Sequence, residues 1–230
     1  MLSAFLNPLG TLYDPTGDTD LAALSDGLLQ LLGDATLIPV TGLSEEELLS
    51  VPAAFTSWQV LAHGAVVLTP DGEEDPAWRR LTRETQAETE GALALAAQAA
   101  THLNALSQLG LDVTVTERGG RPLLVHLRHP HGLALALDQA QAGLHDWLAD
   151  APFRQDLRVA RDPLGLTVLP SAIRPERAVN YVLSEWPAGA VTVGVSALPD
   201  DRAFLALCDL ALVPGQSPLL HAPGDADPEE

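Results

Sequence analysis

The first third of the chain switches repeatedly between strand-like and helix-like spacing of its apolar residues. The predicted elements are a strand at 3–7, a helix at 18–34, a buried strand at 35–40 and two strands within 58–74 that end at Asp71-Gly72. Ser44, with Glu47 three residues later, has the spacing of a capping box and predicts a short helix after the second strand. The pair His63-Gly64 marks the turn between the last two strands. Such alternation is typical of an α/β sheet.

The middle of the chain follows a different pattern, in which each helix precedes two strands. The predicted elements are a helix at 76–109, a hairpin of strands at 111–117 and 121–128, a helix at 129–150, and a hairpin of strands at 153–160 and 164–170. Gly110 is the stop signal of the first helix, Gly119 and Gly120 lie in the first turn, and Asp162-Pro163 lies in the second. The repeated order predicts a self-contained α+β unit.

Strand–helix alternation returns near the end of the chain. The predicted elements are a helix at 175–186, a strand at 190–195, a short helix at 199–207 and a closing strand at 209–214. A discontinuous α/β core with an inserted α+β cap explains this order better than two tandem domains. We therefore expect core segments at 1–75 and 170–216, a cap at 76–169, and a disordered acidic tail at 217–230.

The chain is strongly acidic, with 31 acidic and 12 basic residues and a formal net charge of −19. A surface this negative repels nucleic acid and anionic membranes, so we expect neither as a partner. It also attracts a phosphorylated substrate poorly. Every basic residue is Arg, and no Lys occurs in the sequence, which excludes a lysine nucleophile or a lysine phosphate clamp.

Cysteine usage and apolar run lengths bear on the compartment. Cys208 is the single cysteine, which excludes an intramolecular disulfide and a Cys-cluster zinc site, and its apolar surroundings predict a buried structural thiol. The first residues lack the basic region and the long apolar run of a signal peptide, and no stretch approaches about eighteen uninterrupted apolar residues. We expect a soluble cytoplasmic protein.

Short motifs stand at the ends of the predicted core strands and at the start of the helix after the cap. They are NPLGTL at 7–12, LIPVTGLS at 37–44, LAHGAVV at 61–67, IRPERAVNYV at 173–182 and VSALPDDRAFL at 195–205. In this order, with the cap after the third motif, the chain resembles the haloacid dehalogenase superfamily, in particular its sugar-phosphatase branch with a large α+β cap. The resemblance covers nearly the whole chain and implies a Rossmann-like, three-layer α/β core.

The resemblance extends to scaffold residues but not to the chemical ones. The family's opening motif has two aspartates, where this chain has Asn7 and Leu9, and Pro175 and Ala197 stand where the family has its lysine and the aspartate of a Gly-Asp pair. The family's mechanism implies attack by the first aspartate, proton donation by the second, and charge neutralisation by magnesium and lysine. Asn7 is a poor nucleophile and a weak magnesium ligand, Leu9 transfers no proton and Pro175 donates nothing. We expect no catalytic residue and no cofactor.

Some residues of the same loops could still hold a ligand. The candidates are Gly10, Thr11, Thr41, Gly42, His63, Arg174 and Arg177. The amides of Gly10 and Thr11 and the start of the helix after residue 199 could bind an anion, with an arginine as the cation. The other interpretation is that Gly10, Thr11 and Thr41 serve their turns and that His63 is a turn histidine.

We therefore predict a catalytically inactive, phosphatase-like protein that binds a protein partner or a small phosphorylated or anionic ligand, with a homo-oligomer left open. The alternative is a magnesium-dependent phosphatase of a sugar or glycerate phosphate with relocated groups such as Asp14, Asp200 and Asp201. Magnesium is expected only in that case, since Asp200 and Asp201 also suit the start of a helix as capping charges. A regulatory subunit of an active relative is a third hypothesis.

Two further groups were weighed as sites. His126, His129 and His131 surround a strand end and Pro130, so their side chains need not converge, which favours an exposed turn over a metal site. Ser196 follows a glycine-containing strand but lacks the glycine two residues later that a nucleophile elbow requires.

Overall fold

The computed structural model describes residues 2–17, 21–186, 189–215 and 217–220. Its contacts divide the chain into two compact units. The core unit is Met1–Glu73 with Pro175–Glu230, and the cap unit is Glu74–Arg174. The cap unit is thus a single insertion into a discontinuous core.

The chain changes unit at 73/74 and 174/175, where the sequence predicts changes at 75/76 and 169/170. Hydrogen bonds explain why residues 171–174 stay with the cap unit. Arg158 donates from two guanidinium nitrogens to the carbonyl of Ile173 at 3.1 and 3.0 Å. The N–H of Ser171 donates to the carbonyl of Asp156 at 2.7 Å. The spacing of apolar residues, from which the boundary was predicted, gives no sign of these hydrogen bonds.

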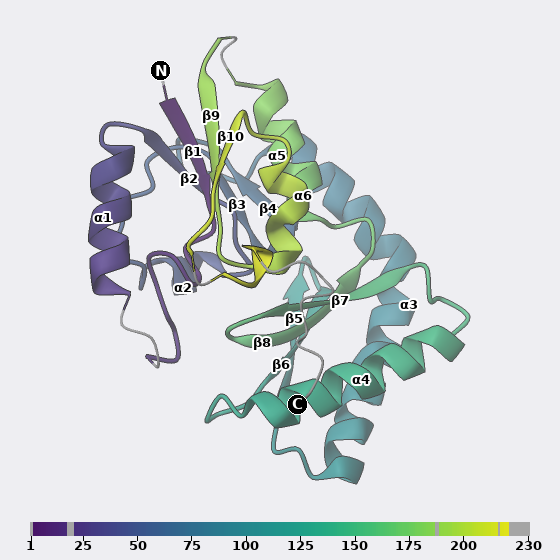
Figure 1. Ribbon diagram of the computed structural model, residues 1–230. Coiled ribbons are helices and arrows are strands. Elements are labelled where there is room, and N and C mark those ends of the chain that lie inside the picture. Colours follow the sequence, from purple (N-terminus) through teal and green to yellow (C-terminus); the bar gives the residue numbers. More distant parts are fainter. Residues whose placement is uncertain (1, 18–20, 187–188, 216, 221–230) are drawn as a thin grey trace. The chain divides into compact units, whose positions relative to one another are not determined.

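A four-stranded parallel sheet forms the centre of the core unit (Figure 1). Its strands are β1 (Leu2–Leu6), β2 (Thr36–Pro39), β9 (Val191–Val195) and β10 (Leu210–Leu212), in the order β10-β9-β1-β2. Parallel neighbours require crossovers, and α1 (Ala22–Leu32) connects β1 to β2 while α6 (Arg202–Leu205) connects β9 to β10. Figure 1 shows α1 on one face of the sheet and α5 (Pro175–Ser184) with α6 on the other. The predicted three-layer α/β core is confirmed.

A short hairpin extends the core unit beyond β2. It pairs β3 (Gln59–Leu61) with β4 (Val66–Leu68) through the turn η1 (Ala62–Gly64), and a bridge between Val40 and Val60 joins it to the end of β2. Before the hairpin lies α2 (Glu45–Leu48), which begins with the predicted capping box: Ser44 Oγ accepts from the N–H of Glu47, and the Glu47 carboxylate accepts from the N–H of Ser44 at 2.8 Å.

The cap unit repeats one motif twice, a helix followed by two strands. Its elements are α3 (Pro76–Ser107), β5 (Asp112–Arg118), β6 (Arg121–Arg128), α4 (Ala134–Asp150), β7 (Leu157–Asp162) and β8 (Gly165–Pro170). The four strands form an antiparallel sheet in the order β5-β6-β8-β7. Both helices pack on this sheet around a shared apolar cluster that includes Leu93, Ala100, Val125, Leu127, Leu144 and Val168. Within the described ranges, every helix is too short or too polar to span a bilayer.

Several predicted ends differ from the observed ones. The helix predicted from residue 129 begins at Ala134, because Pro130 and Gly132 lie in the turn before it. The tail predicted from 217 is ordered at first: Ser217 is buried, and Pro218–Leu220 form the turn η3. The remainder of that tail, 221–230, lies outside the described residues, as do 18–20 of the first predicted helix.

Candidate functional site

The end of β1 brings Asn7 against Asp201. The Asn7 side-chain amide donates from Nδ2 to Asp201 Oδ2 at 2.6 Å, and its Oδ1 accepts from the backbone N–H of Leu9 at 3.1 Å. Together these bonds define the amide orientation, because the reversed amide would set oxygen against carboxylate and NH₂ against N–H. Asn7 is 3% exposed and Asp201 is 6% exposed. The contact therefore lies inside the core unit.

A second donor reaches the same carboxylate oxygen from the end of β9. Ser196 Oγ donates to Asp201 Oδ2 at 2.6 Å and accepts from the N–H of Leu198 at 2.9 Å. A carboxylate removed from water needs donors to offset its lost hydration, and here they include the protein's own amide and hydroxyl. We call Asn7, Ser196 and Asp201 the Asp201 network.

The loop after β1 uses its own amides. The N–H groups of Gly10 and Thr11 donate to backbone carbonyls of the same loop at 3.0 and 3.2 Å. The Thr11 hydroxyl donates to the carbonyl of Asn7 at 2.5 Å, and Thr11 is fully buried. Both amides thus already have acceptors in their own loop, which agrees with the interpretation of Gly10 and Thr11 as turn residues rather than as an anion cradle. Glycine is required at position 10, because its φ is +76° and a Cβ there would lie 3.1 Å from that of Ala197.

Thr41 and His63 meet through the backbone beside the β3–β4 turn. The N–H of His63 donates to the carbonyl of Thr41 at 2.9 Å, and Thr41 Oγ1 accepts from the N–H of Leu43 at 3.3 Å. His63 has a φ of +56°, in the left-handed region, and is buried, whereas Gly42 is half-buried. These bonds agree with the interpretation of Thr41 and His63 as turn residues.

Pro175 stands at the family's lysine position, with the candidate cations Arg174 and Arg177 on either side of it in the sequence. Pro175 opens α5, where a residue without an N–H suits the first turn. Arg177 is exposed on the same helix in the core unit. Arg174 is exposed at the end of the cap unit, where its Nε donates to the carbonyl of Ser171 at 2.9 Å. The two candidate cations therefore belong to different units.

The arrangement does not fit a magnesium ion. Magnesium takes oxygen ligands in octahedral geometry and favours charged oxygens, whereas Asn7 turns a nitrogen toward Asp201. Asp200 is exposed, and Asp14 Oδ1 accepts from the N–H and the hydroxyl of Thr16 at 2.9 and 2.7 Å in its own turn. Throughout the described part of the chain, no three His, Cys, Asp or Glu residues are grouped to hold a metal.

Comparison with known proteins places the fold. Neither a family model nor a curated protein matches the sequence. Among solved structures, an N-terminally truncated IMP-nucleotidase from Plasmodium falciparum matches with a TM-score of 0.56 at 13% identity, covering 93% of this chain and 66% of that one. The C-terminal domain of trehalose-6-phosphate phosphatase from C. albicans matches with a TM-score of 0.55 at 11% identity, covering 84% and 69%.

A third match extends over nearly the full length of both chains. A haloacid dehalogenase-like hydrolase from Bacteroides thetaiotaomicron matches with a TM-score of 0.52 at 11% identity, covering 92% of this chain and 93% of that one. The chain has the haloacid dehalogenase fold. The resemblance stated from the motifs is thereby confirmed at the level of fold. Because the matches include both a sugar-phosphate phosphatase and a nucleotidase, the fold by itself selects no substrate class.

Ser196 is the member of the Asp201 network that sequence reasoning missed. From the sequence, Ser196 was weighed only as a nucleophile, in a motif that lacks a required glycine, whereas in the structure its hydroxyl donates to Asp201. Its position gave a usable signal, since a polar residue at the end of a buried parallel strand lies where such sheets place their functional groups. Ser217 is a related omission: its hydroxyl donates to the carbonyl of Ala197 at 2.7 Å.

The other groups weighed from the sequence form no metal site within the described residues. His126 lies in the cap sheet, with its ring nitrogens 3.0 Å from Thr116 Oγ1 and 3.1 Å from Thr167 Oγ1. The rings of His129 and His131 are 5.9 Å apart in the following turn. Cys208 is half-buried, and burial, followed by the charge of Asp209, raises its thiol pKa to about 11. Such a thiol is unreactive near neutral pH.

Proposed function

We propose that this haloacid dehalogenase-fold protein is inactive as a phosphatase and acts by binding a protein partner or a small ligand. The bond from Asn7 Nδ2 to Asp201 Oδ2 at 2.6 Å carries the proposal. In a magnesium-dependent enzyme, the carboxylate at this place would need a cation and a second negatively charged ligand beside it. Here the Asp201 carboxylate instead accepts a hydrogen bond from the neutral amide of Asn7. Asp201 is thus partnered within the protein.

The missing reagents support the same proposal. Position 7 offers an amide in place of a carboxylate nucleophile, Leu9 is fully buried and apolar, and Pro175 has no side-chain donor. Attack, proton transfer and charge neutralisation act as a unit in phosphoryl transfer, so their joint loss removes the reaction.

The rival proposal, a magnesium-dependent phosphatase with relocated carboxylates, has less support. Asp14 accepts hydrogen bonds within its own turn and Asp200 is exposed to solvent, while Asp201 accepts hydrogen bonds from Asn7 and Ser196. We accordingly propose that function requires no metal or other cofactor. The single, weakly reactive Cys208 is compatible with a reducing compartment, and we propose the cytoplasm.

Stabilisation by ligand tests the proposal. The midpoint of thermal unfolding is measured with magnesium chloride, with inorganic phosphate and with both, against sodium chloride of equal ionic strength. A ligand at about 100 times its Kd stabilises by about 2.7 kcal/mol, which shifts the midpoint by several degrees. We expect no shift beyond the salt control. A cooperative shift with magnesium and phosphate together would support the enzyme instead.

A further inference from the structure

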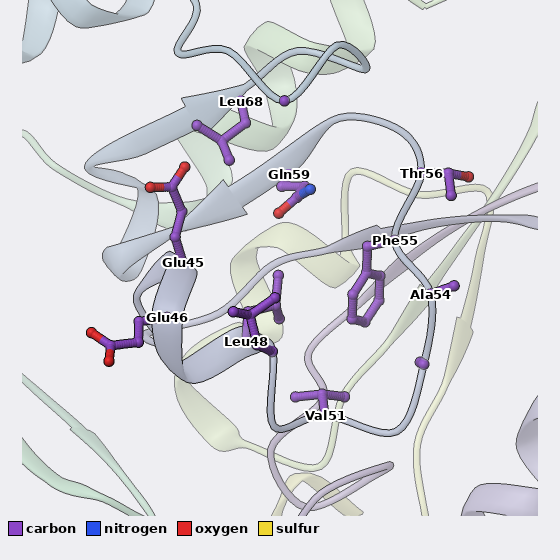
Figure 2. Close-up of a pocket in the computed structure, with 12 residues that line it drawn as sticks. Glu45, Glu46, Leu48, Val51, Ala54, Phe55, Thr56, Gln59 and Leu68 are labelled. Atoms are coloured by element: carbon purple, nitrogen blue, oxygen red, sulfur yellow. The ribbon is translucent and has the colours of Figure 1, made fainter.

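A groove opens on the core unit between α2, the loop after it and the β3–β4 hairpin (Figure 2). Its volume is about 680 Å³. Figure 2 shows Glu45 and Glu46 on one side and Phe55 on the other, with Leu48 between them. None of its lining residues belongs to the Asp201 network. The groove is therefore a surface separate from the site described above.

The groove is lined mainly by apolar side chains and has an unusually exposed one at its rim. Leu48 and Val51 are buried in its floor, whereas the lining residue Leu49 is 86% exposed. Leu49 is the C-cap residue of α2, and its backbone N–H donates to carbonyls of the helix, so its backbone is ordered. Packing a partner against a leucine exposed to this degree, beside an apolar groove, would remove apolar surface from water and so favour binding.

Electrostatics determine which partner fits. Residues 1–73 contain ten acidic residues and no Arg or Lys, so the whole segment that builds the groove is negative. Glu45 and Glu46 are exposed on the rim, and the nearby turn carries the exposed Asp71 and Glu73. The third acid of α2, Glu47, is engaged in the capping box. An apolar floor under a negative rim is complementary to an apolar side chain flanked by positive charges.

We infer that this groove docks a short basic, amphipathic segment of another protein, with a leucine-like anchor over Leu48 and Val51 and Arg or Lys beside Glu45 and Glu46. A second copy of this chain is a poorer occupant, because it carries a net charge of −19 and no Lys. An anionic metabolite is repelled by the same rim. The inference rests on the partner-binding part of the proposed function and gives that partner a chemical class, but it is independent of the loss of phosphatase activity, since the groove shares no residue with the Asp201 network.

The test measures binding of a fluorescein-labelled synthetic peptide to the full chain by anisotropy at 150 mM NaCl. The peptide carries Leu at helical spacing and Lys elsewhere, and its matched partner has Ser in place of each Leu at equal charge. Two variants probe the groove, Glu45→Gln/Glu46→Gln and Leu49→Ser. Their controls, Asp26→Asn/Asp34→Asn and Leu31→Ser, remove the same charges and an exposed leucine from α1 and the residues just after it.

We expect saturable binding of the leucine peptide and weakening of at least about fivefold in both groove variants, with less than about twofold change in the controls. Thermal unfolding of each variant checks that the exposed substitutions leave the fold intact. Equal weakening by the controls, equal binding of the serine peptide, or no saturable binding would each overturn the inference. So would a dimer, measured by light scattering, that Leu49→Ser dissociates, since a second copy would then occupy the groove.

Discussion

Asn7 and Asp201 are joined by a 2.6 Å hydrogen bond in which an amide N–H donates to a buried carboxylate. Together with the Ser196 hydroxyl, this neutral donor stabilises the buried carboxylate. At the end of β1, this hydrogen bond stabilises the core unit. Its geometry also predicts whether a substitution of Asn7 raises or lowers the free energy of unfolding.

Restoring a carboxylate at this position should create a dependence on magnesium. In Asn7→Asp, two carboxylates face each other in a buried site, and their repulsion should lower the free energy of unfolding by about 1–3 kcal/mol in the presence of EDTA. Magnesium should reverse that loss, because a divalent cation bridges the pair. Thermal unfolding with and without magnesium measures both effects.

Asn7→Ala is the matched control for this prediction. It also removes the amide donor, but it adds no charge and so should remain insensitive to magnesium. An equal magnesium response in Asn7→Ala and Asn7→Asp would show that the ion acts elsewhere.

Removing the second donor of the network should destabilise the core. In Ser196→Ala the buried Asp201 carboxylate loses the hydroxyl that donates to it at 2.6 Å. Hydrogen bonds to charged groups contribute about 1.5–3 kcal/mol, so a loss of that size is expected in urea unfolding. Ser184→Ala, at an exposed position at the end of α5, should change stability by less than about 0.5 kcal/mol. Equal effects would remove Ser196 from the account.

The β7–β8 turn should make stability depend on pH. Burial raises the pKa of Asp162 to about 6, although N–H donors from Leu164 and Gly165 and the charges of Arg128 and His126 lower it. Because this pKa exceeds the unfolded value of 3.8, the folded chain keeps a proton that the unfolded chain releases between about pH 4 and 6. This residue's contribution to the free energy of unfolding therefore falls as the pH rises through that window.

Asp162→Asn should remove this slope, and the difference from wild type should reach about 1–2 kcal/mol, since one pKa unit corresponds to about 1.4 kcal/mol and the turn is partly exposed. Urea unfolding at pH 4, 5, 6 and 7 measures it. The exposed Asp146→Asn serves as the control and should keep the wild-type slope. An unchanged slope in Asp162→Asn would assign the pH dependence to other groups.

Gly165 should tolerate no side chain. Its φ is +148°, and a Cβ there would overlap the carbonyl oxygen of Leu127 on the neighbouring strand. Gly165→Ala should therefore cost at least about 3 kcal/mol, through strain and separation of β6 from β8. Gly91→Ala in α3 meets no atom within 4 Å and should be neutral or stabilising by up to about 1 kcal/mol. A mild effect at Gly165 would contradict the observed strand pairing.

Much of the fold could be predicted because local signals suffice for it. The capping box of Ser44 and Glu47 and the glycine turn of the first cap hairpin depend on residues a few positions apart, and both appear where the spacing predicts them. The order of strands and helices then leaves few ways to arrange a parallel sheet.

The Asp201 network could not be predicted in the same way. Its first contact joins residues 194 positions apart, and no periodicity encodes which side chains meet at the end of two parallel strands. The motifs indicated that position 7 was chemically unusual, but whether its amide would face solvent, a ligand or a carboxylate depends on tertiary packing. The Gly10 and Thr11 amides differ, because their acceptors lie within their own loop; there the spacing of apolar residues does not show how the backbone of the turn folds.

The most direct test of the central claim is phosphate release from a panel of sugar phosphates and a generic aryl phosphate, with magnesium, by wild type and by Asn7→Ala. The account predicts that wild type releases no more phosphate than Asn7→Ala, because neither contains a nucleophile at that position. Turnover by wild type that disappears in Asn7→Ala would contradict it, and would make Asn7 a participant in catalysis.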